Sequence, residues 1–233
     1  SDKLSLLDTL PKSYNYQETT KEQDDITLPK EFISLFNVPK NDIEANQALS
    51  YLKRRGINEL DILKYNLGFC KTGIYSGFII IPSYDNNGNL NYFSTRNYST
   101  GSIRFKNPKY SRDIIPFEFF INWDLPIILC EGPFDAMTIK RNVIPLLGKN
   151  LQPNLMKKIL LSKVNKIYIA IDKDAQKQAL NYCERLMNEG KEIYLVDLKE
   201  KDPNSMGFEN FTNLIQETNP LTLSDLIKKK IEL

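Results

Sequence analysis

The stretch Ile127–Arg141, IILCEGPFDAMTIKR, decides the fold of this chain. A short apolar run ends at Cys130 and leads directly into the residues EGP, after which a helical pattern begins. An apolar run bounded by turn residues predicts a buried strand followed by a helix. The strand would end on the carboxylate of Glu131, and a second carboxylate, Asp135, would follow one turn into the helix. These two acids belong either to a solubilising loop or to a metal site that needs further acids downstream.

The residues after this stretch repeat the strand–helix pattern. The apolar runs VIPLLG, KIYIAID and KEIYLVDL alternate with the amphipathic runs QPNLMKKILLS and DAQKQALNYCERLMNEG. This alternation predicts a parallel sheet with helical crossovers. Glu131 follows the first strand, Asp172 and Asp174 follow the third, and Asp202 comes just past the last. Because the carboxyl ends of parallel strands share one edge, we expect these four acids to cluster.

Clustered carboxylates repel one another unless a cation neutralises them. The chain has no histidine, and its three cysteines, Cys70, Cys130 and Cys183, lie far apart, which argues against a zinc site. Oxygen-only ligands favour Mg²⁺ or Mn²⁺, an arrangement typical of phosphoryl transfer. The missing histidines also exclude Ser-His-Asp and Cys-His catalysis. A single Asp-x-Asp more often belongs to a solvated loop, and we expect the same of Asp197. The combination of Glu131, Asp135, Asp172 and Asp174 nevertheless favours a metal site.

Length and composition describe an ordinary globular chain of one large or two small domains. It has 233 residues, of which 41% are hydrophobic and 26% charged, with a net charge of +2. No apolar run approaches the roughly 18 to 20 residues of a membrane span, so we expect a cytoplasmic protein without a membrane partner. We expect a linker or arm at 1–25, a mixed α/β subdomain at 26–122, the parallel-sheet domain at 123–206 and a helical segment at 207–233.

The residues before the parallel sheet predict helices and then a hairpin. We expect helical pieces from residue 28 to 70, including NDIEANQALSYLKRRG, which ends at Gly56, and INELDILKYN, which ends before Gly68. Two strands are expected around the turn DNNGN, in the runs FIIIPSY and NLNYFSTRN. The tail from Gly207 predicts two further helical pieces.

A basic and aromatic stretch follows this hairpin. From Asn86 to Arg112 the chain contains no acid. Its cations are Arg96, Arg104, Lys106, Lys109 and Arg112, and its interleaved aromatic residues are Tyr92, Phe93, Tyr98, Phe105 and Tyr110. Cations that meet phosphates and rings that stack on bases predict a surface for single-stranded nucleic acid. The alternative is an ordinary β-sheet with exposed cations.

The acidic motifs resemble those of the Toprim domain, which primases, topoisomerases and some nucleases share. CEGPFDA is similar to its first motif, LLG to its second, IAIDKDAQ to its Asp-x-Asp motif and KDPN to its late acidic motif. Lys149 stands where the family often has Thr or Ser, and Asn204 replaces a second late acid. The resemblance implies a Rossmann-like domain. It implies that Asp135 supports a set of metal ligands formed by Glu131, Asp172, Asp174 and Asp202.

The upstream half resembles the catalytic core of DnaG-type primases. ALSYLKRRGI…YNLGFC, FIIIPSYDNNGNLNYFSTRN and NPKYSRD are similar to segments of that core. The resemblance places Arg55 and Arg96 on nucleic-acid- or nucleotide-contacting arginines, and Lys109 and Tyr110 near the active site. Lys109 would act with Glu131, Asp172 and Asp174 in catalysis, and Arg112 would substitute for a basic residue missing from the following segment. The short, Asn- and Lys-rich version is more similar to phage or mobile-element primases.

The resemblance implies an enzyme that joins ribonucleotides on a single-stranded DNA template. Its substrates would be nucleoside triphosphates, its metal Mg²⁺ or Mn²⁺, and a replicative helicase, fused or separate, a partner. A phage-encoded enzyme would act in the host cytoplasm. Primases of this family carry a zinc ribbon before the core, and an abrupt polar start favours an excised core. Two alternatives stay open: a Toprim nuclease that uses the same metals, and a non-catalytic Toprim module that binds nucleic acid. A topoisomerase is disfavoured, because the chain has no room for a transesterifying tyrosine domain.

Overall fold

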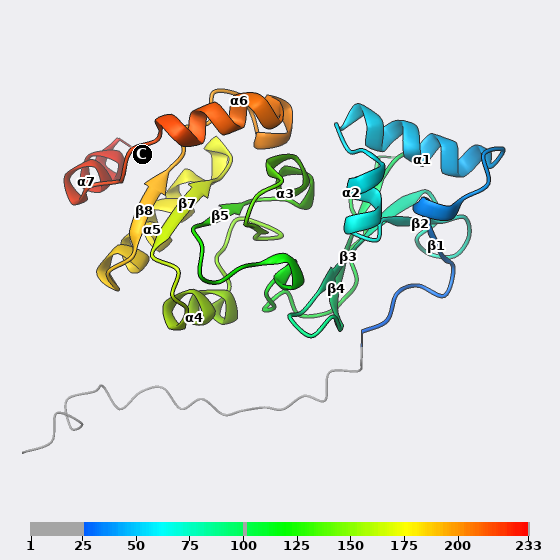
Figure 1. Cartoon of the computed structure of the whole chain (residues 1–233), viewed down its shortest axis with the longest axis horizontal. Helices are drawn as coiled ribbons and strands as arrows, with labels where there is room; N and C mark the ends of the chain where they lie inside the picture. The colour runs from blue at the N-terminus through cyan, green and yellow to red at the C-terminus, as the bar shows by residue number, and fades with distance from the viewer. Residues whose placement is uncertain (1–25, 100–101, 233) are drawn as a thin grey trace, which may run out of the picture.

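The chain folds into two lobes, each built around one sheet. The computed structural model describes residues 26–99 and 102–232. The first lobe holds a four-stranded antiparallel sheet, and the second holds a four-stranded parallel sheet (Figure 1). This arrangement confirms the predicted fold class, a mixed α/β subdomain followed by a domain with a parallel sheet. The predicted arm at 1–25 lies outside the described residues.

The antiparallel sheet of the first lobe has the order β1-β2-β3-β4. Its elements are β1 (Phe32–Ser34), η1 (Leu35–Asn37), α1 (Ile43–Arg54), α2 (Glu59–Lys64), β2 (Gly68–Cys70), β3 (Phe78–Tyr84) and β4 (Leu90–Asn97). The hairpin around DNNGN and the helices before Gly56 and Gly68 are confirmed. The helical interpretation of the residues that form β1 and β2 is wrong. These strands of three residues are too short to show an alternating pattern.

Local signals explain where α1 and α2 begin. The side chain of Asp42 accepts a hydrogen bond from Ala45 N (3.1 Å) and caps α1. In α2, Asn58 and Asp61 form a capping box in which each side chain accepts from the other's backbone N–H at 3.0 Å. Such caps satisfy backbone donors that a helix leaves free. These caps therefore fix the first residues of α1 and α2.

The parallel sheet of the second lobe has the order β6-β5-β7-β8. Its elements, with the connecting 3₁₀ turns, are η2 (Glu118–Phe120), β5 (Ile127–Cys130), α3 (Pro133–Ile139), β6 (Val143–Pro145), α4 (Pro153–Leu161), β7 (Lys166–Ala170), η3 (Lys173–Ala175), α5 (Gln176–Asn188), β8 (Glu192–Leu195), α6 (Pro203–Glu217) and α7 (Leu223–Ile231). The predicted strand–helix alternation is confirmed. The two helical pieces predicted from Gly207 onward are present as the later part of α6 and as α7. Only the start differs, because α6 begins at Pro203 and is interrupted at Gly207, whose φ is 75°.

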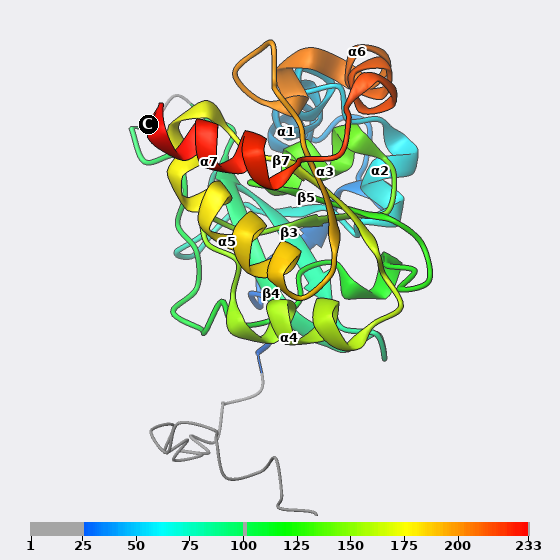
Figure 2. The ribbon, with the colours of Figure 1, turned by 90° about the vertical axis from the view of Figure 1, so that its left-hand side faces the viewer.

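Side chains of successive residues in β5 point to opposite faces of the sheet, as the period of a strand requires. Ile127 and Leu129 join a core with residues of α4, α5 and α7. Ile128 and Cys130 join a second core with residues of α3 and α6. The parallel sheet is therefore covered on both faces, with α5 and α7 side by side in Figure 2.

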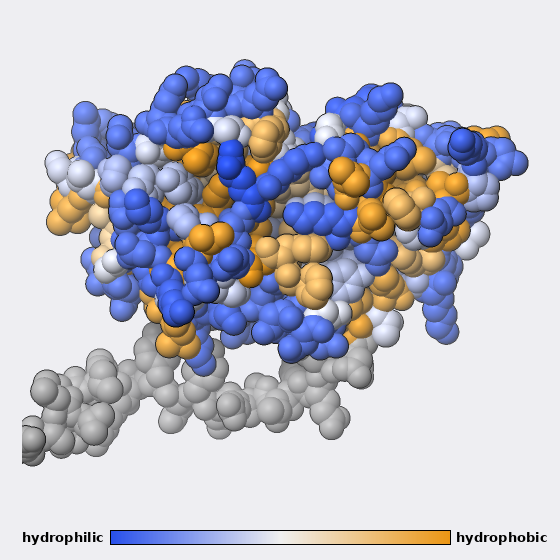
Figure 3. Space-filling model, in the orientation of Figure 1, coloured by the Kyte–Doolittle hydropathy of each residue, from blue (hydrophilic) through white to orange (hydrophobic). Residues whose placement is uncertain are grey.

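The core under α3 and α6 continues into the first lobe, so the two lobes share buried contacts. Lys140, at the end of α3, pairs with Asp61 of α2 at 2.9 Å. Asn204 Nδ2 donates to the carbonyl of Arg55 (2.9 Å) and to Thr138 Oγ1 (2.6 Å). Apolar residues gather between the lobes and along the α1–α2 side in Figure 3. Within residues 26–99 and 102–232, no helix is long and apolar enough to cross a membrane.

Candidate active site

An acidic cluster lies at the carboxyl edge of the parallel sheet. Glu131 follows β5 and Asp172 follows β7, two neighbouring parallel strands whose last residues, Cys130 and Ala170, are paired. Asp174 comes from η3, directly after β7. One carboxylate oxygen from each of these three acids lies within 4.8 Å of the other two. The parallel register therefore brings together side chains that are more than forty positions apart in sequence.

Two oxygens of this cluster have no partner. Among the described residues, Glu131 Oε2 and Asp172 Oδ1 are shielded from solvent and accept no hydrogen bond. Burial, followed by the charge of Asp172, raises the pKa of Glu131. Burial, followed by the charge of Asp202, raises the pKa of Asp172. Unsatisfied buried oxygens and mutual repulsion are what a divalent cation relieves, so this oxygen-only set fits Mg²⁺.

Asp174 differs from the two inner acids because a lysine neutralises it. Lys149 Nζ donates a hydrogen bond to Asp174 Oδ2 at 2.7 Å. This hydrogen bond lowers the pKa of Asp174 and raises the pKa of Lys149. Lys149 follows β6, on the other side of β5 from η3. In the sequence, Lys149 stands out only as a departure from the second Toprim motif.

Asp135 and Asp202 lie beside the cluster and are held by backbone N–H groups. Asp202 caps α6, since its Oδ1 accepts from Ser205 N at 2.7 Å, and it lies outside the group of three. Asp135 is 8% exposed, and its two oxygens accept from Gly132 N (3.1 Å) and Asn204 N (3.2 Å). Burial, with the charge of Asp202, raises the pKa of Asp135 to about 7. Asp135 therefore holds the loop of Glu131 against α6.

A pocket of about 290 Å³ opens next to Glu131, between the two lobes. One wall comes from Glu131, Phe134 and Gly148 of the second lobe. The other wall comes from the first lobe and the segment that follows it, with Thr95, Phe105, Asn107 and Arg112. The pocket thus places an aromatic ring and an arginine opposite Glu131, one acid of the cluster, a combination that suits a nucleotide.

Backbone contacts fix the basic segment 103–107 along the free edge of β4. Thr95 N donates to Asn107 Oδ1 (2.9 Å), and Lys106 N donates to Thr95 Oγ1 (2.8 Å). Asn97 N donates to the carbonyl of Arg104 at 3.0 Å. The side chains of Arg104 and Lys106 remain exposed, so this edge presents cations to solvent.

The remaining predicted cations lie around the same pocket. Arg96 Nε donates to Tyr51 OH (2.7 Å), and its guanidinium lies 4.9 Å from the centre of the Phe105 ring. Arg112 Nη1 donates to the carbonyl of Leu147 at 3.3 Å and links the basic segment to the loop after β6. Lys109 is exposed.

Comparison with known proteins identifies the second lobe. The family model of the Toprim domain matches residues 126–198, which hold the whole parallel sheet and the acidic cluster. Residues 126–198 are a Toprim domain. Toprim domains bind Mg²⁺ through acidic residues, and the chain brings such a cluster together. Among curated proteins, the uncharacterized protein MG010 of Mycoplasma genitalium is 28% identical, over 72% of this chain and 83% of its own length.

Solved structures extend the similarity beyond the Toprim domain. The DnaG primase catalytic domain bound to single-stranded DNA matches with a TM-score of 0.68 and 16% identity, over 82% of this chain and 77% of that one. The zinc-binding and RNA polymerase domains of the Aquifex aeolicus primase match with a TM-score of 0.65 and 23% identity. That match covers 82% of this chain and 61% of the Aquifex chain. Both lobes therefore have the fold of DnaG-type primase cores.

The prediction that Tyr92 and Phe93 belong to a nucleic-acid-binding surface is wrong. Tyr92 and Phe93 are only 1% and 2% exposed, because β4 packs them into the body of the first lobe. Phe105 and Tyr110 are exposed beside the Toprim domain, and Tyr98 is partly buried. Sequence spacing alone does not separate core rings from surface rings, because β4 is covered on both faces.

Arg55, the residue after α1, lies at the junction between α1 and the Toprim domain. Its guanidinium is 5.1 Å from the centre of the Phe134 ring, and its Nε is buried without a hydrogen-bond partner among the described residues. It also lines a pocket of about 470 Å³ with Arg54, Lys140 and Phe208. Arg55 therefore contacts, through the Phe134 ring, the wall of the pocket at Glu131.

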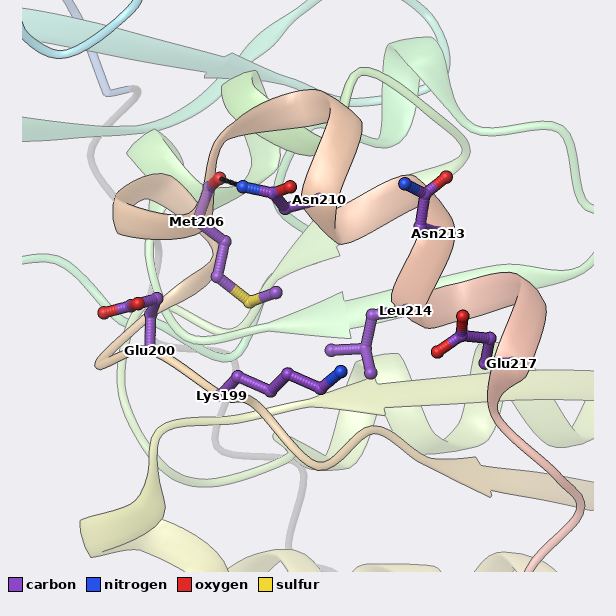
Figure 4. Close-up of a pocket in the computed structure, with 7 residues that line it drawn as sticks. All are labelled: Lys199, Glu200, Met206, Asn210, Asn213, Leu214 and Glu217. Carbon is purple, nitrogen blue, oxygen red and sulfur yellow. Dashed lines mark hydrogen bonds between the residues drawn. The ribbon is translucent and has the colours of Figure 1, made fainter.

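Another pocket, of about 330 Å³, lies between α6 and the segment that follows β8 (Figure 4). It is bounded by Lys199 and Glu200 on one side and by Asn210, Asn213 and Glu217 of α6 on the other, over Met206 and Leu214. None of the clustered acids lines it. The pocket at Glu131 is therefore the better candidate for an active site.

Proposed function

We propose that this chain is the catalytic core of a DNA primase, which makes short RNA primers on single-stranded DNA by metal-dependent nucleotidyl transfer. One observation carries the proposal: a pocket between the lobes has Glu131, a member of the acidic cluster, on one side, and Arg112 with Phe105 of the fixed basic segment on the other. A primase needs both sides, because the metal site handles the triphosphate and the cations hold the template. The likeness to primase cores supports this reading.

In this proposal, Glu131, Asp172 and Asp174 hold Mg²⁺, and the negative charge of the nearby Asp202 also attracts the ion. When bound, the ion supplies charge for the triphosphate oxygens and favours ionisation of the attacking 3′-hydroxyl. Asp135 keeps the Glu131 loop in position through its hydrogen bonds to Gly132 and Asn204. It acts through the loop and makes no contact with the reacting atoms.

The first lobe and the basic segment would bind the nucleic acid and the nucleotide. Arg104 and Lys106 project from the edge of β4 toward solvent, where they meet template phosphates. Lys109 and Arg112 would contact the triphosphate or the template, and Tyr110 would position a base. Arg96 holds Phe105 by stacking, and Phe105 offers its ring to a base in the pocket. Arg55 would contact nucleic acid from the junction between the lobes.

The proposal also covers the choice of metal, the substrates, the partner and the roles of the three segments of the chain. Mn²⁺ would replace Mg²⁺, since both prefer oxygen ligands, and no zinc would be needed within this chain. Nucleoside triphosphates and a single-stranded DNA template are the substrates, and a replicative helicase is the proposed partner. Residues 26–122 would carry the template surface, 123–206 the metal site and 207–233 a helical cover, in a cytoplasmic enzyme.

The test is template-directed incorporation of labelled ribonucleotides on mixed-sequence single-stranded DNA with Mg²⁺ or Mn²⁺. Wild type should make short products, and Asp172→Asn should reduce them at least a hundredfold, since it removes a charged ligand. Asp197→Asn is the matched control, because Asp197 is an exposed acid after β8 outside the clustered group. It should retain wild-type activity.

Other outcomes would favour the alternatives. Metal-dependent degradation of the template, lost in Asp172→Asn, would identify a Toprim nuclease. If neither reaction occurs, a pre-annealed primer bypasses initiation, and extension of it would show a core that lacks only a template-selecting module. Binding of single-stranded DNA without extension would identify a non-catalytic module.

A further inference from the structure

The ion pair between Lys149 and Asp174 divides the acidic cluster into two unequal parts. Lys149 Nζ lies 2.7 Å from Asp174 Oδ2, on the solvent side of the cluster. The two inner oxygens, Glu131 Oε2 and Asp172 Oδ1, accept no hydrogen bond among the described residues. The chain therefore supplies its own cation to one acid and leaves the other two for an external cation.

The loop that carries Lys149 is held in place at two points. Leu147 (φ 54°) and Gly148 (φ 151°) have positive φ values, which turn the chain from the end of β6. Arg112 Nη1 donates to the carbonyl of Leu147 at 3.3 Å. A leucine in the left-handed region is uncommon and is kept only where the surroundings require it. Leu147 and Gly148 also line the pocket, so Lys149 is presented at its rim.

We propose that Lys149 is a tethered counter-ion that competes with the divalent cation for Asp174. It confines the metal to Glu131 and Asp172 until a substrate triphosphate draws the ammonium group away. The charges agree with this role, since three acids and one lysine leave a charge of −2, which one divalent ion neutralises. Asp202 and Lys201 also act on Asp172, with opposite signs. The inference rests on the metal site of the proposed function.

Loss of the Lys149 ammonium group should strengthen binding of the divalent cation. Removing the ammonium group frees Asp174 and raises the negative charge of the cluster from −2 to −3. A unit charge about 5 Å from a divalent ion in a water-like dielectric changes its affinity by roughly tenfold. A lysine that only stabilised the loop would leave the metal affinity unchanged or weaken it. A lysine that contacted only the triphosphate would also leave the affinity for the free metal unchanged.

The experiment is titration of the full chain with Mn²⁺, followed by electron paramagnetic resonance, without nucleotide. Lys149→Met keeps the length of the side chain, and we expect it to bind Mn²⁺ about tenfold more tightly than wild type. Lys163→Met is the matched control, because Lys163 forms an exposed pair with Asp124 at 3.3 Å outside the cluster. Its Mn²⁺ affinity should stay within twofold of wild type, and Lys149→Arg should restore the wild-type value.

A second readout tests the metal-free state. Without Mn²⁺, Lys149→Met should unfold at a lower temperature than Lys163→Met, and saturating Mn²⁺ should reverse that order. Equal or weaker Mn²⁺ binding by a folded Lys149→Met would overturn the proposal. Absence of Mn²⁺ binding in wild type, at concentrations that saturate other carboxylate sites, would overturn the proposed metal site itself and this inference with it.

Discussion

The buried carboxyl group of Asp135 predicts an unusual dependence of stability on pH. Burial, with the charge of Asp202, raises its pKa to about 7, from the usual value of 3.8. Between these two values the folded chain holds a proton that the unfolded chain has released. The free energy of unfolding therefore falls as pH rises through this window, because the folded state must ionise a buried acid. The raised pKa values of Glu131 and Asp172 act in the same direction.

The size of the effect follows from the shift. A group with a pKa of about 7 in the folded chain and 3.8 in the unfolded chain changes the free energy of unfolding by about 2 kcal/mol between pH 5 and pH 7. Acids with lowered pKa values have the opposite sign, but they act only below about pH 4. These acids are Asp42, Asp85, Asp174 and Asp225. Above pH 4, the pH dependence of the free energy of unfolding therefore comes mainly from the acids around the active site.

Urea denaturation at pH 5, 6 and 7 in the absence of divalent metal measures this slope. At pH 5, Asp135→Asn should unfold more easily than wild type, because one of its two hydrogen bonds, to Gly132 N or Asn204 N, is lost, and this difference should shrink or reverse as the pH rises to 7. Its slope between pH 5 and 7 should nevertheless be flatter by about 2 kcal/mol. Saturating Mg²⁺ should flatten the wild-type slope by stabilising the ionised neighbours. An identical slope in wild type and Asp135→Asn would refute the assignment.

Three further predictions concern the junction between the lobes and the nucleic-acid surface. Asp61→Ala removes a helix cap and the 2.9 Å pair with Lys140, so urea denaturation should show a loss of about 2 kcal/mol, whereas Lys140→Met should lose less than about 1 kcal/mol. Phe105→Ala should weaken binding of single-stranded DNA by about 1–3 kcal/mol in fluorescence anisotropy, and the equally exposed Phe119→Ala should not. Lys106→Met should reduce the salt dependence of that binding by about 0.7 in log–log slope, and an unchanged slope would show that Lys106 contacts no phosphate.

The second lobe could be predicted from sequence because its signals are local. Each strand is a short apolar run, each helix has an apolar face, and each run ends on turn residues. The position of Glu131 and Asp172 at one edge follows from the parallel sheet alone. The first lobe was harder, because β1 and β2 have three residues each and gain their partners only from the folded sheet. The burial of Tyr92 and Phe93 is not visible in the sequence either, because β4 is covered on both faces and its residues do not alternate between apolar and polar.

The rest of the site could not be predicted because it depends on contacts between distant loops. Asn204 occupies a position where an acid was expected, yet it serves the site by joining Asp135, Thr138 and the carbonyl of Arg55. An aspartate there would add a further negative charge beside an acid whose pKa is already raised, and it could not donate to Thr138 or the carbonyl. In the same way, Lys149 stands after β6 where a neutral residue is common, and it places a positive charge next to Asp174. Both departures from the family pattern lower the negative charge around the cluster, so they have a common physical effect that the motifs alone do not reveal.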